Sequence, residues 1–194
     1  MPACILHIIK NIDYMKFKRR EKETMHKSSG FTLLELMIIL CLMGIIAAIA
    51  MPNFMSWKHN YRLKAAAQDV YSNFQLAKLT AVRRNILCTI SFNQTVNGEA
   101  FDYIIYLDTD RSLTYTEGEE EVIVKMNLQK EYEGSVAMES ETFPGNAVAF
   151  MPNGLTKGGG GGFGAGTLSL ANTINGSIKV VLSSVGGVRM ERVR

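Results

Sequence analysis

The chain has 194 residues, of which 47% are hydrophobic and 20% are charged, which suffices for one domain with its own core plus an appendage. The formal net charge of +3 misleads, because residues 1–30 carry seven Lys and Arg against three Asp and Glu, whereas residues 31–194 carry 14 against 15. A basic folded domain is therefore excluded. Of three histidines only His59 follows residue 30, which disfavours metal-dependent or histidine-based catalysis.

An apolar run at residues 31–51 contains only two clearly polar residues, Thr32 and Glu35. A helix of that length measures roughly 30 Å, which matches the hydrocarbon thickness of a bilayer. Lysines and arginines gather before the run, so we expect the N-terminal side in the cytoplasm and the following domain to be exported. The small residues precede the run instead of following it, so processing would leave this transmembrane helix in place.

The segment "GFTLLEL" resembles the N-terminus of type IV prepilins and pseudopilins, with Glu35 as the acidic residue of the motif. The resemblance implies that a membrane-embedded prepilin peptidase cleaves between Gly30 and Phe31 and methylates the new amine of Phe31. Residues 1–30 would then be a cytoplasmic leader that is removed. Three translation starts remain open: Met1, Met15 and Met25.

Glu35 places a carboxylate at the start of an apolar helix, and two interpretations follow. A lone acid near a helix end can reach the membrane interface at modest cost. Cleavage after Gly30 would instead create a cation at Phe31, one turn from Glu35, where the helix dipole also favours an acid. In the resembling family this acid is thought to meet the terminal amine of a neighbouring subunit. We therefore interpret Glu35 as setting longitudinal register during assembly.

Residues 52–85 are expected to continue the helix as an amphipathic segment. Apolar residues recur along one face at spacings of four and three: Leu63, Ala67, Val70, Phe74, Ala77 and Ala81. Pro52 predicts a bend, with a helix end at the bilayer surface as the alternative. Arg83 and Arg84 suit the negative end of the helix. Four residues fit an interfacial anchor: Trp57, Lys58, Tyr61 and Arg62.

Residues 86–194 change to short β-rich segments separated by turns, which predicts an antiparallel sheet or two packed sheets against the end of the helix. The expected strands are residues 86–92, 101–107, 121–126, 135–140, 147–151, 167–172, 177–184 and 187–193. The predicted fold class is α+β, with a long N-terminal helix packed on a C-terminal antiparallel β-sheet domain. The resemblance implies that this fold is pilin-like.

The segments "AVAFMPNGLT" and "GTLSL" and the ending "IKVVLSSVGGVRMERV" resemble one branch of the same family. This branch comprises the H-type pseudopilins of type II secretion (GspH) and the FimT-like minor pilins. Its last motif usually reads Gly-Arg-Val-Arg or close to it. Here Gly187 stands where the first arginine is expected.

Two local patterns suggest sites that the sequence does not favour. Asp108 and Asp110 precede an acidic cluster, but an EF-hand loop needs a third oxygen ligand and a glycine at set places, and Arg111 occupies space near the ion. A solvated turn with Asx hydrogen bonding is favoured. The segment "KGGGGGFGAG" is expected to be a flexible loop, since no strand leads straight into it and no helix follows. No metal or cofactor is expected.

Four basic residues near the C-terminus form a candidate DNA-binding cluster: Lys179, Arg189, Arg192 and Arg194. FimT-like proteins, which the chain resembles, bind DNA through C-terminal arginines, and phosphate contacts need only such a cluster. Arg189, with or without Arg192, is expected on one exposed edge. An edge strand protected from aggregation by its charge is the favoured interpretation, and Gly187 weakens the DNA hypothesis further.

The sequence favours a minor pseudopilin of a type II secretion system, a structural subunit and not an enzyme. The alternative is a FimT-like minor pilin of a type IV pilus that binds DNA for uptake. The implied partners are the prepilin peptidase, other pseudopilins or pilins of the filament, and an inner-membrane assembly platform. The expected location is the bacterial inner membrane, in a single pass. The cysteines are not expected to form an internal disulfide: Cys4, Cys41 and Cys88.

Overall fold

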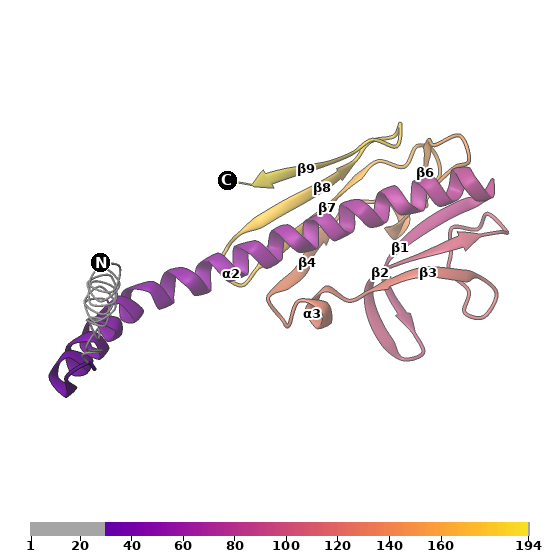
Figure 1. The fold of residues 1–194 in the computed structure, drawn as a ribbon. Coiled ribbons are helices and arrows are strands. Elements are labelled where there is room, and N and C mark those ends of the chain that lie inside the picture. Colours follow the sequence, from indigo (N-terminus) through magenta and orange to yellow (C-terminus); the bar gives the residue numbers. More distant parts are fainter. Residues whose placement is uncertain (1–29, 194) are drawn as a thin grey trace, which may run out of the picture. The chain divides into compact units, whose positions relative to one another are not determined.

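A computed structural model describes residues 30–193 of the chain (Figure 1). The predicted leader up to residue 29 and Arg194 lie outside the described residues. The first described element is helix α2 (Leu33–Arg84), which is 52 residues long. The chain divides into two compact units within this helix, after Ala47.

The first part of α2 is apolar and exposed. Every described side chain from residue 30 to residue 47 is exposed to solvent. One helix of the described part, α2, is long and apolar enough to span a bilayer, and none of its most apolar 18-residue window is buried. Cys41 lies on this exposed segment.

The backbone remains helical through Pro52, so a helix end at the bilayer surface is the wrong alternative. The bend at Pro52 stays a prediction. Further along α2, the predicted apolar face is buried, and Ala66 joins it, with exposures of 0 to 3%: Leu63, Ala66, Ala67, Val70, Phe74, Ala77 and Ala81. The amphipathic pattern therefore identified the face that packs on the β-domain.

The strands form two antiparallel sheets. The five-stranded sheet has the order β3 (Glu121–Met126), β2 (Glu99–Asp108), β1 (Leu87–Val96), β5 (Ala147–Phe150) and β6 (Thr156–Gly158). The four-stranded sheet has the order β4 (Val136–Glu141), β7 (Gly166–Asn172), β8 (Ser177–Leu182) and β9 (Val188–Val193). Two short helices lie between strands, α3 (Leu128–Glu131) and η1 (Pro144–Asn146).

The α+β fold with an antiparallel domain against the helix is confirmed, and all eight predicted strands are present. In Figure 1 the strands of both sheets lie along the magenta part of α2. One hydrophobic core joins that helix face to both sheets. At its centre Phe92 stacks on Phe143 with ring centroids 4.7 Å apart, and Phe74 packs against both rings. Cys88 is buried in this core.

The prediction that no strand leads straight into the glycine-rich segment, residues 157–166, is wrong, because β6 ends at Gly158. A strand of three residues is too short to be recognised from the sequence pattern. The segment then folds back, and Lys157 forms a bridge with Phe163. A Cβ atom on Gly164 would lie 2.7 Å from the backbone carbon of Lys157. Glycine is required there for close backbone packing, which composition alone did not distinguish from flexibility.

Polar contacts tie α2 to the connections of the β-domain. The Arg62 guanidinium donates to Ser135 Oγ at 2.7 Å and pairs with the Glu133 carboxylate. Lys78 Nζ donates to the carbonyl oxygen of Gly186 at 2.9 Å. Arg62, which the sequence grouped with an interfacial anchor, thus fastens the helix to the domain.

The outer face of the five-stranded sheet carries a second layer of apolar contacts. Leu113, from the connection between β2 and β3, packs on Leu87 and Ala149. Tyr115 of the same connection lies against Tyr106, with ring centroids 5.3 Å apart. Residues 109–120 therefore fold back over the sheet and are called the β2–β3 loop below.

Candidate functional site

The start of α2 is organised by a side-chain cap. The backbone N–H of Glu35 donates to Thr32 Oγ1 at 3.2 Å, and the N–H of Leu36 donates to the Thr32 carbonyl oxygen at 3.1 Å. Thr32 is therefore the N-cap, and Glu35 is the third residue of the helix. A threonine followed three positions later by glutamate is the capping-box pattern, a signal that the sequence interpretation missed.

The cap places the predicted assembly residues around the helix start. Phe31 lies before the helix with 75% of its surface exposed, and Gly30 is exposed as well. Glu35 lies in the first turn, at the positive end of the helix dipole. Among residues 30–193 the Glu35 carboxylate takes part in none of the ion pairs.

The helix surface that follows is apolar on all sides. The large exposed apolar residues of its first part are Leu33, Leu34, Leu36, Met37, Ile38, Ile39, Leu40, Leu42, Met43, Ile45 and Ile46. A helix that is hydrophobic all round is stable only when lipid or other helices cover it. The described residues of this chain do not cover it.

The C-terminal basic residues lie on the exposed edge strand β9 or its neighbour β8, but they do not form one patch. Arg189 Nε donates to Glu191 Oε1 at 2.7 Å, and Glu191 lies opposite Lys179 in the register of β8 and β9. Arg192 lies opposite Ile178, on the other face of the strand. Arg194 is outside the described residues. Arg189 and Arg192 thus both lie exposed on edge strand β9, as expected, but their side chains face opposite sides because they are three residues apart in the strand.

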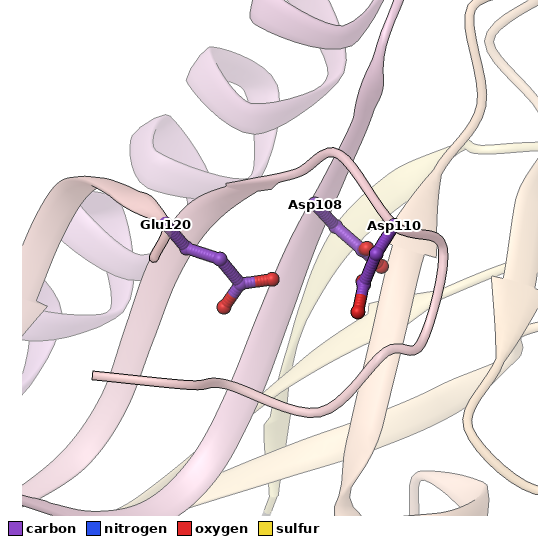
Figure 2. Close-up of side chains that lie close together, drawn as sticks. All are labelled: Asp108, Asp110 and Glu120. Carbon is purple, nitrogen blue, oxygen red and sulfur yellow. The ribbon is translucent and has the colours of Figure 1, made fainter. Parts of the chain in front are cut away.

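The β2–β3 loop brings together three carboxylates (Figure 2). Oxygens of Asp108, Asp110 and Glu120 all lie within 4.8 Å of one another. The predicted Asx hydrogen bond is present, since the N–H of Ser112 donates to Asp110 Oδ1 at 3.0 Å. Glu120 brings the third carboxylate to the cluster, which the sequence interpretation did not identify. The spacing of the neighbouring glutamates does not show which of them reaches Asp108 and Asp110, because this depends on the fold of the loop.

The carboxylates of this cluster have different environments. The backbone N–H of Ser112, followed by its side chain, holds the pKa of Asp110 below its usual range. Burial, followed by the negative charges of Asp108 and Asp110, raises the pKa of Glu120. Glu120 therefore takes up a proton more readily than an isolated glutamate, whereas Asp110 takes one up less readily than an isolated aspartate.

Comparison with known proteins covers both parts of the chain. A family profile described as "Type II transport protein GspH" matches residues 66–186. The chain belongs to the GspH family. A second profile, "Prokaryotic N-terminal methylation motif", matches residues 25–51, which include Gly30, Phe31 and Glu35. The pilin-like pseudopilin resemblance is thus confirmed.

A relative from Thermus thermophilus, the pilin-like protein PilA1, is 30% identical over 91 residues. That alignment covers 47% of this chain and 55% of the relative, so the chain spans about half the length of the curated relative that it matches. No solved structure matches the chain. The GspH match ends at residue 186, before β9, so Arg189 and Arg192 lie outside it.

Proposed function

We propose that this GspH-family chain is a minor pseudopilin, a non-enzymatic structural subunit of a type II secretion pseudopilus. The observation that carries the proposal is the helix surface of residues 33–47, apolar on all sides and exposed within its own chain. It coincides with the N-terminal methylation motif. Such a surface is suited to lipid before assembly and to sister helices in a filament.

Processing would prepare this surface. Prepilin peptidase would remove residues 1–30 by cutting the exposed bond between Gly30 and Phe31, and would methylate the new amine of Phe31. The amine would lie just before the Thr32 cap. The Glu35 carboxylate, held in the first helical turn, would pair with the amine of a neighbouring copy and so fix the axial register.

The proposed organisation follows from charge and length. The basic leader would remain in the cytoplasm, residues 31–51 would span the inner membrane, and residues 86–194 would form the exported domain. Residues 52–85 would link them, with a bend at Pro52 that helps the helix pack in the filament. Assembly would also require an inner-membrane platform.

The test separates processing from assembly by comparing Glu35→Ala with Glu139→Ala, an exposed acid on β4. Both variants are expressed in cells that assemble the filament. Intact-mass measurement reports cleavage, and co-purification with the other pseudopilins reports incorporation. We expect cleavage of both proteins but loss of incorporation for Glu35→Ala alone. Normal incorporation of Glu35→Ala would overturn the register role, and an uncleaved wild-type chain would overturn the proposed function.

A further inference from the structure

Three acidic residues at the C-terminal end of strand β2 and in the β2–β3 loop are not used by the proposed filament role. Asp108 is the last residue of β2 and is completely buried, Asp110 is the second residue of the β2–β3 loop, and Glu120 is its last. Figure 2 shows the carboxylates of Asp108 and Asp110 side by side, with Glu120 extending toward them from the other end of the loop. Their oxygens lie within 4.8 Å of one another.

The buried carboxylate of Asp108 is only half satisfied. Its Oδ2 accepts hydrogen bonds from Thr89 Oγ1 and from the N–H of Leu113, both at 3.0 Å. Its Oδ1 is buried and has no hydrogen-bond partner among the described residues. A buried acceptor without a partner is unfavourable, and it is more so beside two further carboxylates. This unpartnered, buried oxygen is a second observation, besides the clustering of the carboxylates, that points to a positively charged ligand.

No cationic side chain among residues 30–193 forms an ion pair with the three carboxylates, and Arg111 takes part in none of the ion pairs of these residues. The side chain of Arg111 is exposed, and its backbone adopts φ +65°. Arg111 therefore does not neutralise these carboxylates by an ion pair in the described structure, and the expectation that it occupies space near an ion stays a prediction.

Packing holds the ligands in place independently of any ion. Leu113 is seated on Leu87 and Ala149, and Tyr115 lies against Tyr106. The N–H of Thr116 also donates to Glu120 Oε2 at 3.0 Å. Apolar packing and hydrogen bonds from the loop backbone thus hold the carboxylates together without a bound ion, so the site is largely preformed.

We propose that Asp108, Asp110 and Glu120 bind a Ca²⁺ ion. Calcium takes oxygen ligands at about 2.3–2.6 Å, so opposite ligands lie roughly 4.6–5.2 Å apart, which suits this cluster. Magnesium requires a tighter octahedron, and zinc prefers nitrogen or sulfur ligands. Water would complete the shell. The bound ion would neutralise the cluster and fasten the β2–β3 loop to the end of β2.

The experiment measures thermal unfolding of the full chain in detergent, first in EDTA and then with about 10 mM CaCl₂ or MgCl₂. This concentration is roughly tenfold above a Kd on the order of 1 mM, which is typical of weak calcium sites. We expect calcium to raise the Tm by roughly 3–6 °C, and magnesium to raise it less. Glu120→Gln and Asp110→Asn keep the shape of the side chains and should lose most of the shift. Glu117→Gln, an exposed acid of the same loop outside the cluster, should keep it.

The relative stability of the wild type and Glu120→Gln should reverse between EDTA and calcium, which distinguishes ion binding from a structural defect. In EDTA, Glu120→Gln should be more stable than the wild type because it removes one of three crowded negative charges. In calcium it should be less stable, whereas a packing defect would lower the Tm in both conditions. Terbium luminescence sensitised by Tyr106 and Tyr115 gives a second readout of binding, which Glu120→Gln should weaken. The proposal is overturned if calcium leaves the wild-type Tm unchanged and terbium gives no signal, or if Glu120→Gln retains the full calcium shift.

Discussion

The two parts of helix α2 use apolar residues in opposite ways. Residues 33–47 are apolar on every side and entirely exposed. Residues 63–81 are apolar along one face, and that face is buried against both sheets. The second part is stabilised by its own domain, whereas the first part depends on an environment that the described chain does not provide.

The difference shows how one helix can serve a folded domain and an assembly. Small residues of the second part let the sheets approach closely, and Phe74 packs against the stacked rings of Phe92 and Phe143. The first part has bulky apolar residues around its circumference, and it starts with the Thr32 cap and the acidic residue Glu35. Substitutions in the second part should therefore affect folding, and those in the first should affect assembly.

The largest effect on folding is expected at Phe74. Phe74→Ala would leave a cavity in the aromatic centre of the core and lower the free energy of unfolding by about 3–5 kcal/mol. Leu42→Ala, in the exposed part of α2, should leave the stability of the domain unchanged. Denaturant unfolding of the full chain in detergent, followed by near-ultraviolet circular dichroism, measures both. Equal losses would contradict the division of the helix.

A smaller effect is expected at Arg62, whose side chain is 20% exposed. Arg62→Ala removes the contacts to Ser135 and Glu133 and should lower the free energy of unfolding by about 1–2 kcal/mol. Lys64→Ala, at an exposed position of the same helix that takes part in none of the ion pairs of the described residues, is the control and should change it by less than about 0.5 kcal/mol. Equal stability of the two variants would show that Arg62 does not fasten the helix to the domain.

A still smaller effect should depend on pH. The Arg62 side chain holds the pKa of Glu133 below its ordinary value of 4.5. A lowered pKa in the folded state means that the stabilisation is present above pH 4.5 and is lost as the pH falls through the folded-state pKa. The Tm difference between wild type and Glu133→Gln should therefore be present at pH 7 and vanish in acid. A difference that grows in acid would contradict this sign.

The smallest effect is expected at the edge strand β9. Arg189 is paired with Glu191, and Arg192 faces the other side of the strand. Neither face of β9 therefore concentrates enough positive charge to bind the phosphates of duplex DNA tightly. Titration of the chain without its basic residues 1–30 with duplex DNA at two salt concentrations should show no micromolar, salt-sensitive binding. Binding that disappears in the Arg189→Ala, Arg192→Ala double variant would favour the DNA-uptake alternative.

Periodicity explains which parts of the fold could be predicted. The apolar face at Leu63 to Ala81 and the eight strands follow from local patterns that reflect burial. Strand β6, of three residues, and helix α3, of four, are too short to show a period, so they were missed. The close packing at Gly164 depends on a distant backbone segment, which no local pattern encodes.

The candidate sites divide in the same way. Gly30, Phe31 and Glu35 belong to a continuous motif and could be located from sequence, and Thr32 as the cap was available from the same residues. The carboxylate cluster could not be predicted from the sequence, because the path of the β2–β3 loop is what brings Glu120 close to Asp108. The separation of Arg189 from Arg192 required the strand register.

Photo-crosslinking directly tests whether sister helices cover the exposed part of α2 in an assembled filament. A photoreactive amino acid replaces Leu42, in the middle of the exposed apolar surface, in cells that assemble the filament. We expect crosslinks to other pilin-like subunits that are lost when Glu35→Ala is added. Crosslinks to lipid alone, in cells with assembled filaments, would contradict it.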